Sequence, residues 1–163
     1  MSNHDEILRN YLSESLDVIN QALKVLDDME SNFSQIENFK IYANLVDRVM
    51  GTTQSLIMMV ENNERLQLVS DYTTLFKVVA NQSLKLNMAE SLYDIVVALL
   101  IDATETLNQI LQNFNKSHND IKKMIQPEFL DRVRLVKSKL SPQQNSVNQN
   151  EIDELLLKIS QKI

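Results

Sequence analysis

Apolar side chains recur along this chain at steps of three and four residues, the spacing that one face of a helix collects. Five such segments follow one another, at about residues 5–29, 35–60, 64–84, 88–114 and 119–140. Pro127 places a kink or break near the start of the fifth segment. Short polar connections between the segments favour antiparallel neighbours. The pattern therefore predicts an all-α protein, in which an antiparallel up-and-down four-helix bundle has a fifth helix beside it.

The polar pattern changes after residue 140. Residues 141–150, SPQQNSVNQN, are uncharged and nearly free of apolar side chains, which predicts a flexible linker. Residues 151–163 then predict an amphipathic helix with the stripe Ile152, Leu155, Leu156, Ile159 and Ile163, and with Asn148 and Glu151 as a capping box. So short a helix is marginal alone and needs a surface to dock on. We therefore expect a helical bundle over residues 1–140, a linker over 141–150 and a tethered docking helix over 151–163.

Composition supports this fold class and excludes several functions. One glycine and two prolines in 163 residues leave little chemistry for tight hairpin turns. The formal net charge of −6 argues against a nucleic-acid-binding surface, which would concentrate Lys and Arg on one face. Because the chain has no cysteine, disulfides, thiolate zinc sites and cysteine nucleophiles are excluded.

The sequence lacks the patterns of a membrane or secreted protein. Its longest apolar run, Ile95–Ile101, is far shorter than the roughly 20 residues that cross a bilayer. The N-terminal residues have no basic segment followed by an apolar one, so no secretory signal is predicted. We expect a cytoplasmic protein without a membrane span. The two histidines, His4 and His118, are predicted to be solvated surface residues.

The only glycine, Gly51, lies inside the second helical segment, in the stretch VDRVMGTTQSL. A glycine in a helix interior costs about 1 kcal/mol relative to alanine, so its presence needs a reason. One reason is access, because a missing Cβ lets a partner approach the helix surface closely. The other is relief of crowding between packed helices. Both explanations are open at the level of the sequence.

The segment from about residue 5 to 140 resembles the histidine phosphotransfer (HPt) domain of the chemotaxis kinase CheA. In that family the second helix carries His-x-x-Lys-Gly-Ser, about forty residues after the first core position of helix one. Ile7 opens the first stripe here and DRVMGTTQSL follows about forty residues later, so Gly51 falls on the family glycine and Thr52 on its serine. The stretch LKLNMAESLYDIVVALL is also similar to the start of the family's fourth helix. The resemblance implies a four-helix bundle with an additional helix.

In this alignment Asp47 replaces the phosphorylated histidine and Met50 replaces the lysine. Asp47 would present an anion to a phosphate and to a receiver's acidic pocket, with no lysine at Met50 to compensate. A register one step later puts Gly51 at the histidine position and Gln54 at the lysine position. Both registers imply that ordinary phosphotransfer fails.

The resemblance therefore implies a non-catalytic chemotaxis or two-component signalling module that binds a CheY-like response regulator. The docking face expected on the second helix consists of Asp47, Met50, Gly51 and Gln54. A chemotaxis kinase or flagellar switch components are further expected partners. No metal site or cofactor is expected in this chain, and magnesium belongs only to the partner receiver.

The C-terminal stretch NEIDELLLKI is similar to two short elements that bind CheY: the DEIDALL-type peptide of the switch proteins FliM and FliY, and the closing helix of CheZ. The similarity implies a helix-in-groove contact. The side chains entering the groove would be Ile152, Leu155 and Leu156, with Ile159 continuing the stripe and Asp153 and Glu154 facing a basic rim. Docking of this helix on its own bundle, or on a second copy, is equally open.

Two other functions stay open. A CheZ-like phosphatase of a phosphorylated receiver would use a carboxylate and a glutamine one helical turn apart to hold the pocket and orient water. The pairs with this spacing are Asp17 with Gln21 and Glu105 with Gln109. A structural bundle could instead form a homodimer through a methionine-rich face near Met50, Met58 and Met59.

Overall fold

The structure is a computed structural model that describes residues 3–60, 63–85, 88–140 and 146–162. In these residues it contains helices and no strands, so the all-α prediction is confirmed. The helices are α1 (Asn3–Met29), η1 (Phe33–Gln35, a 3-10 turn), α2 (Asn38–Met59), α3 (Glu64–Lys85), α4 (Glu90–Gln112), α5 (His118–Lys122), α6 (Pro127–Leu140) and α7 (Ser146–Lys162). None of these helices is both long enough and apolar enough to cross a membrane.

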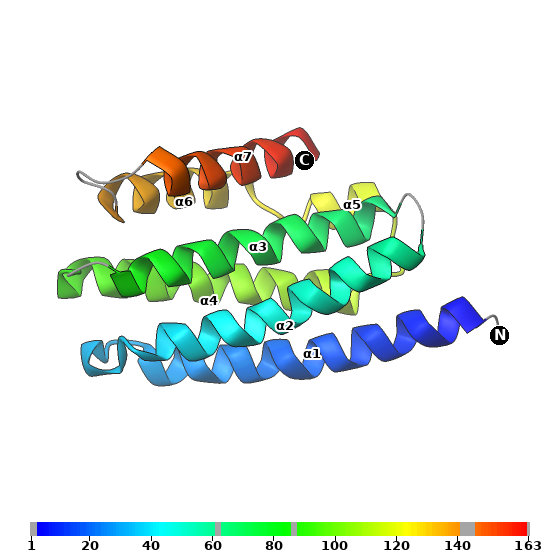
Figure 1. Ribbon diagram of the computed structural model, residues 1–163, viewed down its shortest axis with the longest axis horizontal. Coiled ribbons are helices and arrows are strands. Elements are labelled where there is room, and N and C mark those ends of the chain that lie inside the picture. Colours follow the sequence, from blue (N-terminus) through cyan, green and yellow to red (C-terminus); the bar gives the residue numbers. More distant parts are fainter. Residues whose placement is uncertain (1–2, 61–62, 86–87, 141–145, 163) are drawn as a thin grey trace.

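The long helices are arranged in layers, which Figure 1 shows from the side. The first layer is α1 with α2, and the second is α3 with α4. Contacts between α2 and α3 and between α1 and α4 join these two layers. A third layer of α6 and α7 covers the opposite side, where α6 packs on α4 and α7 packs on α3. Consequently α3 lies in the middle of the molecule.

The central position of α3 explains its composition. Residues on most of its circumference are buried, including the polar side chains Ser70, Thr73 and Ser83. Thr73 donates a hydrogen bond to the Val69 carbonyl (2.8 Å), and Ser83 donates one to the Val79 carbonyl (2.8 Å). A buried hydroxyl that bonds its own helix backbone leaves no unsatisfied donor. Small polar residues can therefore fill α3 where three layers meet.

Tyrosine hydroxyls join the helices across the core. Tyr11 of α1 lies 2.8 Å from the Thr53 hydroxyl of α2, and Tyr42 of α2 lies 2.8 Å from the Thr104 hydroxyl of α4. Each threonine donates its single hydrogen to a carbonyl of its own helix, so the tyrosines are the donors in these pairs. Tyr93 of α4 donates to the carbonyls of Met29 and Asn32, which fixes the end of α1 against α4.

The break predicted near Pro127 is confirmed. The fifth periodic segment is divided into α5, which ends at Lys122, and α6, which begins at Pro127. Proline fits the first position of a helix because its missing N–H would have no intrahelical partner there. At the start of α5, the Ser117 hydroxyl accepts a hydrogen bond from the backbone N–H of Asp120 (3.2 Å).

The C-terminal helix begins earlier than the sequence pattern predicted. It starts at Ser146, so half of the expected 141–150 linker is helical, and residues 141–145 lie outside the described part of the chain. Asn148 falls inside α7, so the capping box with Glu151 is wrong. Ile163, the last residue of the predicted stripe, also lies outside the described residues. The other four stripe residues join the same hydrophobic core as the bundle.

Candidate functional site

Gly51 lies on the outward surface of α2. In the described part of the chain, a Cβ built on this residue would meet no atom of a neighbouring side chain or helix within 4 Å. Gly51 itself is exposed, and its φ angle is not positive. Crowding between helices therefore does not require glycine here, and neither does an unusual backbone conformation. Of the two explanations offered by the sequence, only access to the helix surface is consistent with this environment.

We predict that Gly51→Ala stabilises the protein by about 0.5–1 kcal/mol, because alanine removes backbone freedom from the unfolded chain and meets no clash. Equilibrium denaturation with urea measures this difference. The matched control is the reverse change, Ala98→Gly, at an exposed interior position of α4, which should destabilise by a similar amount. A loss of stability in Gly51→Ala would contradict the open environment of this residue.

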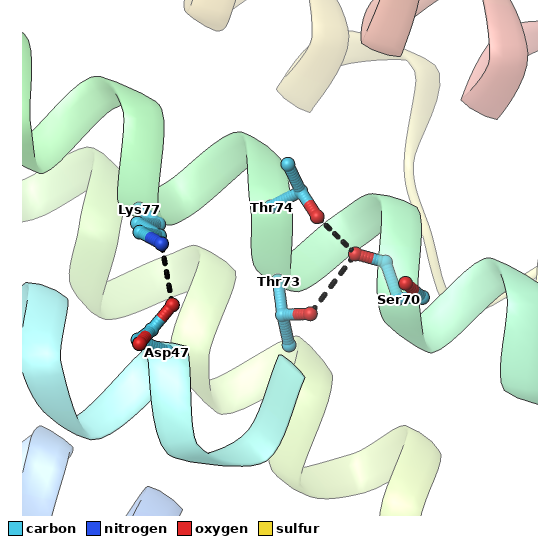
Figure 2. A network of polar contacts seen from close by, with 5 residues as sticks. All are labelled: Asp47, Ser70, Thr73, Thr74 and Lys77. Atoms are coloured by element: carbon cyan, nitrogen blue, oxygen red, sulfur yellow. Dashed lines mark hydrogen bonds and ion pairs between the residues drawn. The ribbon is translucent and has the colours of Figure 1, made fainter. Parts of the chain in front are cut away.

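Asp47 has a countercharge that the sequence motif did not predict. Its carboxylate forms an ion pair with the Nζ of Lys77, which reaches across from α3 (Figure 2). Figure 2 also shows Thr73 and Thr74 bonded to Ser70 on the α3 segment that precedes this lysine. The motif predicted that Asp47 has no compensating lysine because Met50 stands at the lysine position. Lys77 of α3 supplies that positive charge instead. Lys77 lies thirty residues along the chain from Asp47, and only the packing of α2 on α3 brings the two together.

The four residues of the predicted docking face lie on two sides of α2. Met50 and Gln54 line a groove of about 360 Å³ between α2 and α3, which Lys77, Lys85 and Glu151 of α7 also line. Gly51 instead lines a groove of about 390 Å³ between α2 and α1. Gly51 is exposed, and the Asp47 side chain is about half-exposed where it meets Lys77 of α3. The predicted face is thus accessible but divided, with Met50 and Gln54 at one groove and Gly51 at the other.

The predicted tail contacts are covered in the structure. Ile152, Leu155, Leu156 and Ile159 are all buried, and α7 packs on α3 and α6. Asp153 forms an ion pair with Lys137 of α6. The sequence left three docking surfaces open for this helix: a receiver, its own bundle and a second copy. In the structure the helix docks on its own bundle. A partner could use the same apolar face only after α7 had left α3.

The acid and glutamine pairs of the phosphatase hypothesis are accessible. Asp17 and Gln21 are accessible on α1, and Glu105 and Gln109 are accessible on α4. A hydrogen bond between the Asn20 and Asn108 side chains (2.8 Å) holds these parts of α1 and α4 together. Accessible acids and amides are common on helix surfaces, so their accessibility does not by itself favour catalysis.

A further groove, of about 730 Å³, lies where α2 is connected to α3. His118 lines it, and its Nε2 lies 3.7 Å from the Glu64 carboxylate. The His118 side chain is only 20% exposed, contrary to the prediction of a solvated residue. Nearby, Arg65 donates to the Phe114 carbonyl (2.8 Å) and its guanidinium lies over the Phe114 ring (5.0 Å). These contacts fix the start of α3 to the end of α4, which is a structural role.

Comparisons with protein-family models, with curated proteins and with solved structures find no match to this chain. The functional argument therefore rests on the geometry of the site. Among the described residues no group of three histidine or acidic side chains is placed to hold a metal ion. The most specific feature is the open glycine on α2, beside the ion pair of Asp47 and Lys77.

Proposed function

We propose that this chain is a non-catalytic signalling module whose α2 surface docks a CheY-like receiver domain. In this proposal α1 to α4 are the four helices of an HPt-like bundle, and α5 to α7 are additions to it. The observation that carries the proposal is the exposed, uncrowded Gly51 in the interior of α2. A residue that weakens the helix and serves no packing purpose is best explained by close contact with a partner.

The charge next to Gly51 supports docking. An isolated acid at position 47 would repel the acidic pocket of a receiver, but Lys77 partly neutralises Asp47. Ion pairs with exposed partners contribute little to stability, typically less than about 1 kcal/mol, so Lys77 is free to turn toward a partner carboxylate. The phosphate-accepting imidazole is still missing at this position, which is why the proposed role is binding without phosphotransfer.

Calorimetric titration with a CheY-like receiver from the same organism tests this proposal. We expect Gly51→Gln to weaken binding about tenfold or more, because a long side chain would separate the two backbones at the contact. The matched control, Ala98→Gln, places the same side chain on the exposed surface of α4 and should leave affinity unchanged. Failure of the unmodified protein to bind at a concentration at which it is monomeric, or equal affinity in the Gly51 variant, would overturn the proposal.

The phosphatase alternative is distinguished by a different readout. A phosphatase would accelerate loss of phosphate from a magnesium-loaded, phosphorylated receiver, whereas a docking module would leave that rate unchanged. If acceleration is found, Gln21→Ala and Gln109→Ala decide which accessible pair acts, because each removes one amide that could orient water. Both substitutions are at accessible positions, so neither should alter the fold.

A further inference from the structure

The groove between α1 and α2 is an exposed apolar surface. It is lined by Ile7 and Tyr11 of α1 and by Leu56 and Met59 of α2, with Gly51 in the same lining. Ile7 and Met59 are 37% and 66% exposed, and Met58, which precedes Met59 in the chain, is 87% exposed. Large apolar side chains that gather at a surface groove mark interaction sites. Methionine is suited to such a surface because its side chain adapts to the partner.

Charges of opposite sign border this groove. Glu14, on the α1 side, lines the groove and also lines a smaller cavity together with Arg48 of α2. Both side chains are accessible, and within the described part of the chain neither forms an ion pair. Asp17, one turn after Glu14, adds a second negative charge to α1. The surface thus has an acidic helix beside a helix that carries an unpaired arginine.

We propose that the α1–α2 groove is the interface of a homodimer, in which α1 of each copy lies on α2 of the other. A twofold axis parallel to these helices and between them produces this arrangement. The rotation keeps each residue at its own height along the bundle, so Glu14 faces the partner's Arg48 and Ile7 faces the partner's Met59. Each contact occurs twice, as in any interface with twofold symmetry.

A second copy fits this surface better than an unrelated partner because both complementary halves are present on one chain. The acidic and basic positions lie at nearly the same height, as their shared cavity indicates, so the rotation brings opposite charges together. The alternative rotation, which places α1 on α1, would bring Glu14 and Asp17 close to like charges. Gly51 lies at the same surface, where a missing Cβ allows the helices of the two copies to approach closely.

The proposed dimer is a second use of the α2 surface, in addition to receiver docking, and it limits when a receiver can bind. A dimer covers Gly51, so self-association and receiver binding at α2 exclude each other. The proposed dimer can be tested with the protein alone, without any receiver. Its failure would therefore leave the docking proposal intact, and the absence of receiver binding would leave the dimer proposal intact.

Sedimentation velocity of the full chain over a range of concentrations tests the dimer. We expect a monomer–dimer equilibrium in the unmodified protein. Glu14→Arg and Arg48→Glu should each weaken association about tenfold or more, because each variant opposes like charges twice. Mixing the two variants should restore association, since each substituted side chain then faces a residue of opposite charge on the other copy. Restoration on mixing cannot arise from contacts within one chain.

Matched charge reversals on α6 provide the control. Glu128→Arg and Lys139→Glu alter exposed positions in the layer farthest from α1 and α2, and should leave association unchanged. Circular dichroism of every variant confirms that the fold is retained. The proposal is overturned if the unmodified protein is monomeric throughout, if the single reversals dimerise normally, or if two folded variants fail to associate when mixed.

Discussion

Replacing Ile152 with alanine is expected to lower the free energy of unfolding by about 2–4 kcal/mol, and Ile159→Ala by a similar amount. Both side chains are completely buried on the face of α7 that packs on α3 and α6. The loss combines the transfer of apolar surface with the cavity that remains. Urea denaturation monitored by circular dichroism measures it. The neighbouring Leu157 is 57% exposed, so Leu157→Ala is the matched control and should change stability by less than about 0.5 kcal/mol.

Deleting residues 146–163 should have a larger effect than either substitution, with a clear fall in the melting temperature. The sequence pattern predicted a docking helix over residues 151–163 that is joined to the bundle by a flexible linker. In the structure α7 contributes four buried side chains to the shared core, and its loss would uncover α3. An unchanged melting temperature would show that α7 opens independently of the bundle. Hydrogen exchange of the intact protein distinguishes an α7 that unfolds with the bundle from one that opens on its own. An α7 that opens on its own would exchange its amide hydrogens much faster than α3.

The helices could be predicted from the sequence because their signal is local. The periodic segments at about 35–60 and 64–84 correspond to α2 at Asn38–Met59 and α3 at Glu64–Lys85. Steps of three and four residues determine which face of a helix is apolar, whatever lies opposite. The break at Pro127 was predictable for the same reason, since a missing N–H acts within its own helix.

The candidate site was only partly predictable, because pairing between helices depends on their relative positions. No pattern near Asp47 indicates that Lys77, thirty residues away, supplies its countercharge. The sequence singled out Gly51, but only the coordinates distinguish an open surface from a crowded crossing. The start of α7 was missed because residues 146–150, SVNQN, are mostly polar and mostly have weak helix preferences. A helix that docks through its later turns can extend over such residues.

We expect the protein to unfold abruptly as the pH rises above about 10. Burial raises the pKa of each of the four tyrosines above its ordinary value near 10, and for Tyr93 the charge of Asp94 adds to this effect. Hydrogen bonds to Thr53 and Thr104 lower the pKa of Tyr11 and Tyr42 by less than burial raises it. All four tyrosines therefore ionise at a higher pH in the folded protein than in the unfolded chain, and this pKa is raised furthest for Tyr42 and Tyr72.

The sign of the effect follows from proton binding. Below about pH 10 both states keep these protons, and stability does not depend on the tyrosines. Above it the unfolded chain releases protons that the folded protein retains, so stability falls by up to about 1.4 kcal/mol per pH unit for each tyrosine. Tyr42 and Tyr72, the two tyrosines whose pKa values are raised furthest, together approach roughly 3 kcal/mol per pH unit, a large part of the stability of a domain.

Tyrosinate absorbance and far-ultraviolet circular dichroism, followed in one alkaline titration, measure this transition, and the chain has no tryptophan to obscure the absorbance. Ionisation and loss of helix should occur together. Tyr72 packs against the rings of Phe76 and Phe129, at 4.3 Å and 5.5 Å between centroids, and Tyr72→Phe keeps this packing while removing one ionisable group. The variant should therefore unfold at higher pH. A tyrosine that ionises near pH 10 while the helices persist would contradict the burial of that hydroxyl, and with it the connection between layers that the tyrosines provide.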